Sequence, residues 1–175
     1  QRNVDVTIQD GTITDIRPAD EAHTADVDAS PYTLIPGLID MHNHWHMRGR
    51  AWGNRQGRLW LAYGVTTSRS AGDLAYEARE TREATHAGTG IGPRFLNNGE
   101  PLDGNRCSFG FMRCVTSAEQ VDREIERILA LGYSCVKSYQ RLPVTLERRL
   151  VDGLAAHGIP VISHYVYPAV ASGLH

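Results

Sequence analysis

The sequence predicts an α/β fold in which parallel strands alternate with helices. From Tyr32 onward, short apolar runs alternate with segments of helical periodicity, which is the pattern of repeated βα units. The chain has 175 residues, of which 41% are hydrophobic, so it is long enough to bury one substantial core. Polar residues and histidines follow several of the apolar runs, as expected where parallel strands end at a functional edge.

The first predicted element is a β-hairpin. Residues 4–8 and 12–16 alternate apolar and polar side chains, and Asp10-Gly11 between them is a strong turn signal. Residues 20–30 are polar and predict a loop before the βα units begin.

Five strands and four helices are predicted after this loop. The strands are expected near residues 33–40, 64–69, 94–98, 134–139 and 160–164, and the helices near 54–62, 74–87, 118–131 and 145–157. Ser117 with Gln120 predicts a capping box at the start of the third helix, and Gly132 predicts its end. Residues 99–115 predict a long βα loop, and such loops carry function in barrels.

The composition excludes some classes of partner. A net charge of -2 and a pI near 6.5 give no electrostatic reason to expect nucleic acid or an anionic membrane surface. No apolar run approaches the roughly 20 residues that a membrane-spanning helix needs. Cys107, Cys114 and Cys135 are an odd number without Cys-x-x-Cys spacing. The first two could pair within a loop, but free thiols are expected.

The residues at the strand ends predict a metal site. His42 and His44 are one residue apart, so in a strand both side chains point to the same face and could hold one metal ion. The alternative is a pair of surface histidines beside a turn. Lys137 and His164 lie at the ends of two later strands. Lys137 could instead be a salt-bridged lysine, and His164 a core histidine.

Several motifs of the chain resemble those of the amidohydrolase superfamily of metal-dependent hydrolases. The segment PGLIDMHNH at residues 36–44 matches the first-strand motif of that superfamily, and GVTTSR at 64–69 matches its second-strand motif. Further matches are IGPR at 91–94, VKSY at 136–139 and IPVISH at 159–164. The resemblance covers almost the whole chain. It points to the imidazolonepropionase- and prolidase-like branch, and most to bacterial members that carry a TolB-like propeller.

The resemblance implies a partial (β/α)₈ TIM barrel, of which the chain supplies about strands one to five. Residues 1–31 would then be part of a small N-terminal β-sandwich, and residues 32–175 the first part of the barrel. A complete barrel needs about 250 residues. The superfamily also uses a strand-six histidine and a strand-eight aspartate, which we do not expect in this chain. No catalytic residue is therefore assigned, and His175 is not expected to be a ligand.

The resemblance also implies two divalent metal ions, which are expected to be zinc. His42 and His44 would bind the first ion, and His164 the second. Lys137 would be carboxylated on its amine and bridge both ions, because a carbamate supplies two anionic oxygens whereas a protonated lysine cannot be a ligand. A metal-bridging hydroxide would then attack the scissile carbonyl.

Three further residues are candidates for substrate binding: His46, Tyr139 and Tyr165. The alternatives are a plain loop histidine and tyrosines that only pack beside the strands. Arg69 is usually followed by aspartate in the superfamily, but here Ser70 follows it, and whether Asp73 replaces that acid is left open.

The sequence therefore predicts a fragment of a binuclear amidohydrolase that cleaves amide bonds in peptide-like or acyl-amino-acid substrates. The alternatives are a lactonase or deaminase of the same superfamily and a metal-binding half-barrel without turnover. The expected partners are a small-molecule or dipeptide-like substrate, without nucleic acid or membrane, and either a second copy or a missing C-terminal half. Bacterial cytoplasm and periplasm are both compatible with the sequence.

Overall fold

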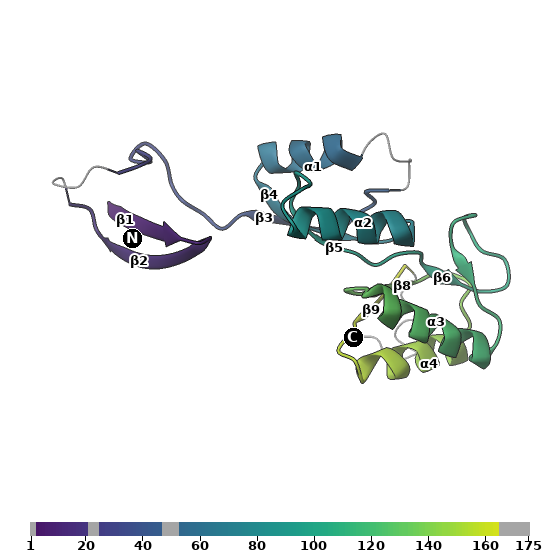
Figure 1. Cartoon of the computed structure of the whole chain (residues 1–175). Coiled ribbons are helices and arrows are strands. Elements are labelled where there is room, and N and C mark those ends of the chain that lie inside the picture. The colour runs from purple at the N-terminus through teal and green to yellow at the C-terminus, as the bar shows by residue number, and fades with distance from the viewer. Residues whose placement is uncertain (1–2, 21–24, 47–52, 165–175) are drawn as a thin grey trace. The chain divides into compact units, whose positions relative to one another are not determined.

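The computed structural model describes residues 3–20, 25–46 and 53–164, and the chain divides into two compact units, residues 1–36 and 37–175. The first unit contains the antiparallel pair β1 (Val4–Gln9) and β2 (Thr12–Pro18), shown in Figure 1. Asp10 and Gly11 between them have φ of 50° and 74°, as a primed hairpin turn requires. The predicted hairpin is confirmed, and its place in a β-sandwich stays a prediction.

The second unit alternates strands and helices, which confirms the α/β prediction. Its elements in chain order are β3 (Leu38–Asn43), α1 (Gly53–Ala62), β4 (Val65–Ser70), α2 (Ala75–His86), β5 (Arg94–Leu96), β6 (Leu102–Asp103), β7 (Arg113–Cys114), α3 (Ala118–Leu131), β8 (Val136–Ser138), α4 (Val144–Ala155) and β9 (Val161–Ser163). Within the described ranges, no helix combines the length and the apolar character needed to cross a membrane.

The strand pairs described in the second unit are all parallel. One sheet has the order β3-β4-β5 and the other has the order β7-β6-β8-β9. The backbone N–H of Ser134 donates to the carbonyl of Asn97 at 2.8 Å, which links the end of β5 to the segment before β8. Because the strands within each sheet are parallel, their carboxyl ends share one edge of that sheet.

Helices α3 and α4 lie side by side and cover the main apolar core (Figure 1). The predicted capping box is confirmed, because the Ser117 side chain accepts from the Gln120 N–H and the Gln120 side chain reaches back. Gly132 ends α3 in the left-handed conformation, with φ of 65°. The most deeply buried apolar residues of this core include Val121, Ile128, Val136, Leu150 and Leu154.

Two element predictions need correction. The first βα strand begins at Leu38 rather than near residue 33, because its partner β4 begins only at Val65, which pairs with Leu38. Pro36 lies before this start and has no N–H to offer a strand partner. The predicted loop at residues 99–115 contains the short strands β6 and β7, which pair with each other in parallel.

The expectation of free thiols at Cys107 and Cys114 is wrong, because these residues form a disulfide. Pairing of β7 with β6 sets Cys114 opposite Asp103, so the loop returns close to Cys107. The two Cα atoms are 5.5 Å apart, within the usual range for a disulfide. Cys135 is a buried free cysteine.

Candidate metal centre

The four predicted metal ligands lie near the carboxyl ends of β3, β8 and β9. The imidazole rings of His42, within β3, and His44, just beyond it, have centroids 5.5 Å apart. Lys137 is the middle residue of β8, and His164 directly follows β9. Burial lowers the pKa of His42 and of His164, and Lys137 and then His44 lower both further. The structure thus brings the four side chains within electrostatic range, while their role as ligands stays a prediction.

The ring of His44 is oriented by a neighbouring loop. Its Nδ1 lies 2.8 Å from the carbonyl oxygen of Gly72, which can only accept a hydrogen bond. Nδ1 therefore carries the hydrogen, and Nε2 keeps the lone pair that a metal ligand needs. Gly72 has φ of 137°, and a Cβ there would meet Pro101 Cγ at 2.7 Å. A side chain at Gly72 would therefore disturb the carbonyl that orients His44.

Lys137 is the only lysine among the 18 lysine and arginine residues of the chain. It is 3% exposed, and within the described ranges no carboxylate forms a salt bridge with it. Burial lowers the pKa of its amine, and the charge of Arg69 lowers it further. The uncharged amine, which burial favours, is the form that can react with carbon dioxide to give a carbamate.

The donor chemistry fits a divalent metal only when Lys137 takes part. In the part of the chain that the structure describes, no three His, Cys, Asp or Glu side chains are close enough together to hold a metal ion. His42 lies near Lys137 and Arg69, and His164 lies near Lys137; positive charge on these side chains would repel a metal ion. Carboxylation would turn Lys137 from a cation into an anion with two oxygen donors. A metal site at these residues would therefore depend on a modified lysine as its key ligand, and this stays a prediction.

His46, predicted to contact substrate, lies in the interior at 5% exposure. Its Nε2 is 2.8 Å from Thr81 Oγ1, and its Nδ1 is 3.4 Å from Asp73 Oδ2. The ring stacks on Trp45 with centroids 5.8 Å apart. Both ring nitrogens are therefore engaged, and this geometry favours a structural role over the predicted substrate contact.

Asp73, the residue left open as a replacement for the acid missing after Arg69, contacts the backbone that follows β3. It is fully buried, and its carboxylate accepts hydrogen bonds from the backbone N–H groups of His46 at 2.8 Å and Trp45 at 3.3 Å. These contacts fix the chain immediately after His44. Asp73 therefore positions the end of β3, a role that sequence spacing alone does not reveal.

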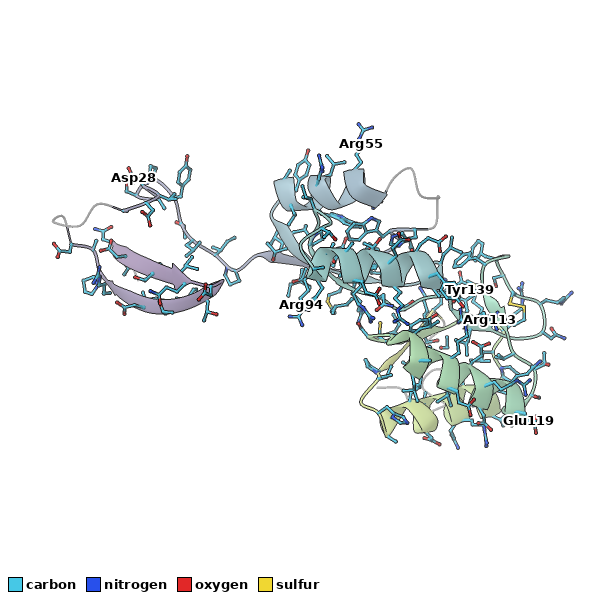
Figure 2. The ribbon with its side chains drawn as sticks, viewed as in Figure 1. Asp28, Arg55, Arg94, Arg113, Glu119 and Tyr139 are labelled. Atoms are coloured by element: carbon cyan, nitrogen blue, oxygen red, sulfur yellow. A yellow bond between two sulfur atoms is a disulfide. The ribbon has the colours of Figure 1, made fainter. Side chains whose placement is uncertain are left out.

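Tyr139, labelled in Figure 2, lies beside two candidate ligands, Lys137 and His164, and its role in substrate binding stays a prediction. Its ring stacks on the His164 ring with centroids 4.4 Å apart, and Lys137 Nζ is 5.9 Å from the Tyr139 centroid. Tyr165, the third candidate for substrate contact, lies outside the described residues.

Sequence reasoning did not identify Glu147, which supports the strand that carries Lys137. The hydroxyl of Ser138, the next residue in β8, donates to Glu147 Oε1, and both side chains are buried. Glu147 shares one face of α4 with buried Leu150 and Leu154. The carboxylate of Glu147 at helical spacing from two leucines was the feature of the sequence that could have indicated this buried supporting role.

No protein-family profile matches the sequence, and no curated protein matches it at a significant level. Solved structures do match. A candidate prolidase from Bifidobacterium longum has a TM-score of 0.84 at 24% identity, over 98% of this chain and 47% of that chain. A Xaa-Pro dipeptidase with methionine bound in its active site has a TM-score of 0.81 at 16% identity, over 98% of this chain and 55% of that chain.

The ochratoxinase of A. niger is also similar, with a TM-score of 0.73 at 18% identity, over 99% of this chain and 55% of that chain. The chain thus spans about half the length of these solved chains. The similarity extends over nearly all of this chain and confirms its fold as part of a (β/α)₈ barrel.

Proposed function

We propose that this chain is part of a metal-dependent hydrolase of the amidohydrolase superfamily, which cleaves amide bonds in small peptide-like or acyl-amino-acid substrates. The observation that carries the proposal is Lys137, a buried lysine in β8 near His42, His44 and His164, for which the described residues provide no salt bridge. A lysine in this setting has a strong reason to be carboxylated, since burial disfavours its charged form.

The similar solved structures support the reaction class. They include a Xaa-Pro dipeptidase and an ochratoxinase. Fold alone does not define activity, so the argument depends on the residues of the site. The motifs that carry the resemblance contain His42, His44, Lys137 and His164, which come from three separate strands or directly follow them, and these side chains lie within electrostatic range of one another.

Each of the four candidate ligands has a definite role in the proposed site. His42 and His44 would hold one ion, His164 a second, and carboxylated Lys137 both. Two bound divalent ions would supply Lewis acidity and an activated water. The Gly72 carbonyl keeps the Nε2 lone pair of His44 available for binding. No general base is assigned within the described residues.

Asp73 and Glu147 keep the ligand-bearing segments in place. Asp73 holds the backbone after His44, and Glu147 binds Ser138 next to Lys137. Both carboxylates are buried, so each is held away from competing water. Such fixed support is what a catalytic site needs to keep its ligands in register.

The proposal is tested by assaying the full-length protein, loaded with zinc in bicarbonate buffer, against a panel of substrates. The panel contains Xaa-Pro dipeptides, N-acetyl amino acids, a lactone and a nucleobase. We expect amide hydrolysis that a chelator abolishes and that Lys137→Met reduces to background. Arg58→Met, which removes an exposed cation on α1, is the matched control and should retain wild-type activity. Full activity in the Lys137→Met protein would contradict the proposal, and turnover of the lactone or nucleobase alone would change the substrate class.

A further inference from the structure

The loop between β6 and β7 carries an exposed aromatic side chain next to the candidate metal centre. Phe109 is 47% exposed, although a phenyl ring in water forgoes favourable burial. Its ring makes an edge contact with Tyr139, with centroids 6.0 Å apart and an interplanar angle of 70°. The Phe111 ring also stacks on Phe109, with centroids 6.1 Å apart. An aromatic surface therefore extends from this loop to Tyr139.

Tyr139 connects this surface to the candidate ligands. Its ring stacks on His164 at 4.4 Å, and Lys137 Nζ lies 5.9 Å from its centroid. A group bound between Lys137 and His164 would therefore have Tyr139 as its neighbour and Phe109 as the next side chain outward. Apolar atoms of such a group would find an aromatic contact on this side.

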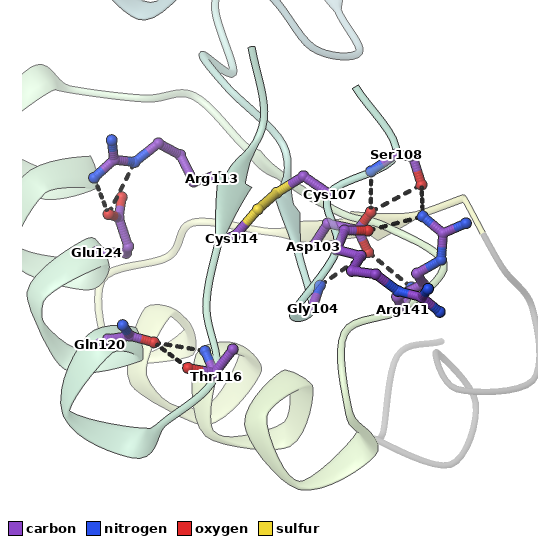
Figure 3. The surroundings of a disulfide bond; sticks show 11 residues. Asp103, Gly104, Cys107, Ser108, Arg113, Cys114, Thr116, Gln120, Glu124 and Arg141 are labelled. Atoms are coloured by element: carbon purple, nitrogen blue, oxygen red, sulfur yellow. Dashed lines mark hydrogen bonds and ion pairs between the residues drawn. A yellow bond between two sulfur atoms is a disulfide. The ribbon is translucent and has the colours of Figure 1, made fainter. Parts of the chain in front are cut away.

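The loop that carries Phe109 is fixed by a covalent bond. The disulfide between Cys107 and Cys114 closes the loop around Phe109 and ties it to β7 (Figure 3). Both cysteines are within a few residues of Phe109, so the bond restricts the positions that this phenyl ring can take. A restricted side chain loses less entropy when a ligand binds against it.

Hydrogen bonds fix the same loop a second time. The buried carboxylate of Asp103 accepts from the N–H of Gly104, the N–H and hydroxyl of Ser108, and the N–H of Arg141, all at 2.8–2.9 Å (Figure 3). The Arg141 guanidinium returns to the loop and donates to the Arg106 carbonyl at 2.8 Å and to the Ser108 hydroxyl at 3.1 Å. The loop is therefore held against the segment that follows Tyr139.

We propose that Phe109 and Tyr139 form an apolar wall of the substrate site, which selects substrates with an aromatic or large apolar group next to the scissile amide bond. The proposal rests on the proposed function for the position of that bond. Phe109 is then a specificity-determining residue. The disulfide and Asp103 are its positioning groups, because they hold the loop and touch no substrate.

The test compares two ligands that cannot be hydrolysed, benzylphosphonate and methylphosphonate, which share an anionic head and differ by a phenyl ring. Their binding to the zinc-loaded full-length protein is measured by titration calorimetry. We expect benzylphosphonate to bind about tenfold more tightly, the equivalent of one good aromatic contact. Phe109→Ala should remove most of this preference and leave methylphosphonate affinity unchanged. Tyr76→Ala, which removes an exposed aromatic ring on α2, is the matched control and should change neither affinity.

The paired Cys107→Ser and Cys114→Ser substitution should also reduce the preference for the phenyl ring, with circular dichroism confirming that the fold is retained. Equal binding of the two phosphonates by the wild type, or an unchanged preference in Phe109→Ala, would overturn this inference and leave the proposed function standing. If neither phosphonate binds, the anion site itself is absent, and both proposals fail.

Discussion

Replacing Asp73 by alanine should destabilise the segment that carries His44 by a measurable amount. The Asp73 carboxylate accepts hydrogen bonds from the His46 N–H at 2.8 Å and the Trp45 N–H at 3.3 Å, and both residues are buried. A hydrogen bond to a charged group contributes about 1.5–3 kcal/mol. Because one of these two bonds is long, we expect the free energy of unfolding to fall by about 3 kcal/mol in total.

Equilibrium urea unfolding, followed by tryptophan fluorescence, measures this change. With a denaturant slope of about 2 kcal/mol/M, the midpoint should fall by about 1.5 M. Asp152→Ala removes an exposed aspartate of α4 and should stay within about 0.5 kcal/mol of the wild type. A midpoint for Asp73→Ala as close to the wild type as that control would refute the role assigned to this carboxylate. Asp73→Asn, which keeps one acceptor oxygen, should lie between the two.

Three further predictions concern the lysine, the histidines and the disulfide. Lys137→Met should raise the Tm of the metal-free protein, because the substitution removes a buried amine whose charged form is disfavoured. Differential scanning calorimetry measures this change, and a lower Tm would contradict the prediction. The pKa values of His42 and His164 are lowered in the fold, so the unfolded chain binds more protons as the pH falls below about 6.5. The metal-free protein should therefore lose stability as the pH falls from about 6.5 to the lowered pKa values. The urea unfolding midpoint should be lower at pH 5 than at pH 7.5, and replacing both histidines by alanine should reduce this difference. Thiol titration of the unreduced, denatured chain should find Cys135 but neither Cys107 nor Cys114, and three reactive thiols would show that the disulfide is absent. Replacing Cys107 and Cys114 by serine should lower the free energy of unfolding by about 2 kcal/mol, as the closure of a loop of this size predicts.

Local signals in the sequence were sufficient to predict most elements. The α3 boundaries follow from Ser117, Gln120 and Gly132, whose capping interactions involve only neighbouring residues. The hairpin follows from Asp10-Gly11 in the same way. The strand positions of His42 and Lys137 were predictable because apolar runs end there. These features need no knowledge of the tertiary structure.

The features that sequence reasoning missed depend on contacts between distant segments. Asp73 binds the backbone of Trp45 and His46, 28 and 27 residues earlier, and nothing near Asp73 indicates these partners. The start of β3 is set by its pairing with β4. The disulfide depends on the pairing of two-residue strands β6 and β7, which are too short to leave a periodic pattern.

The buried position of His46 has the same kind of cause. The sequence predicted a substrate contact or a plain loop histidine here, and β3 does end before His46, at Asn43. Trp45 and His46 then pack with Phe95, a residue of another strand. Spacing in the sequence predicts a shared face only as far as the strand continues.

In the proposed site, Lys137 binds divalent metal together with His42, His44 and His164. The most direct test is the zinc content per chain, measured by plasma mass spectrometry after dialysis with and without bicarbonate. We expect about two zinc ions per chain with bicarbonate, as in two-metal hydrolytic sites, and a loss of zinc in Lys137→Met but not in Arg58→Met. Zinc content that does not depend on Lys137 or on bicarbonate would contradict the account.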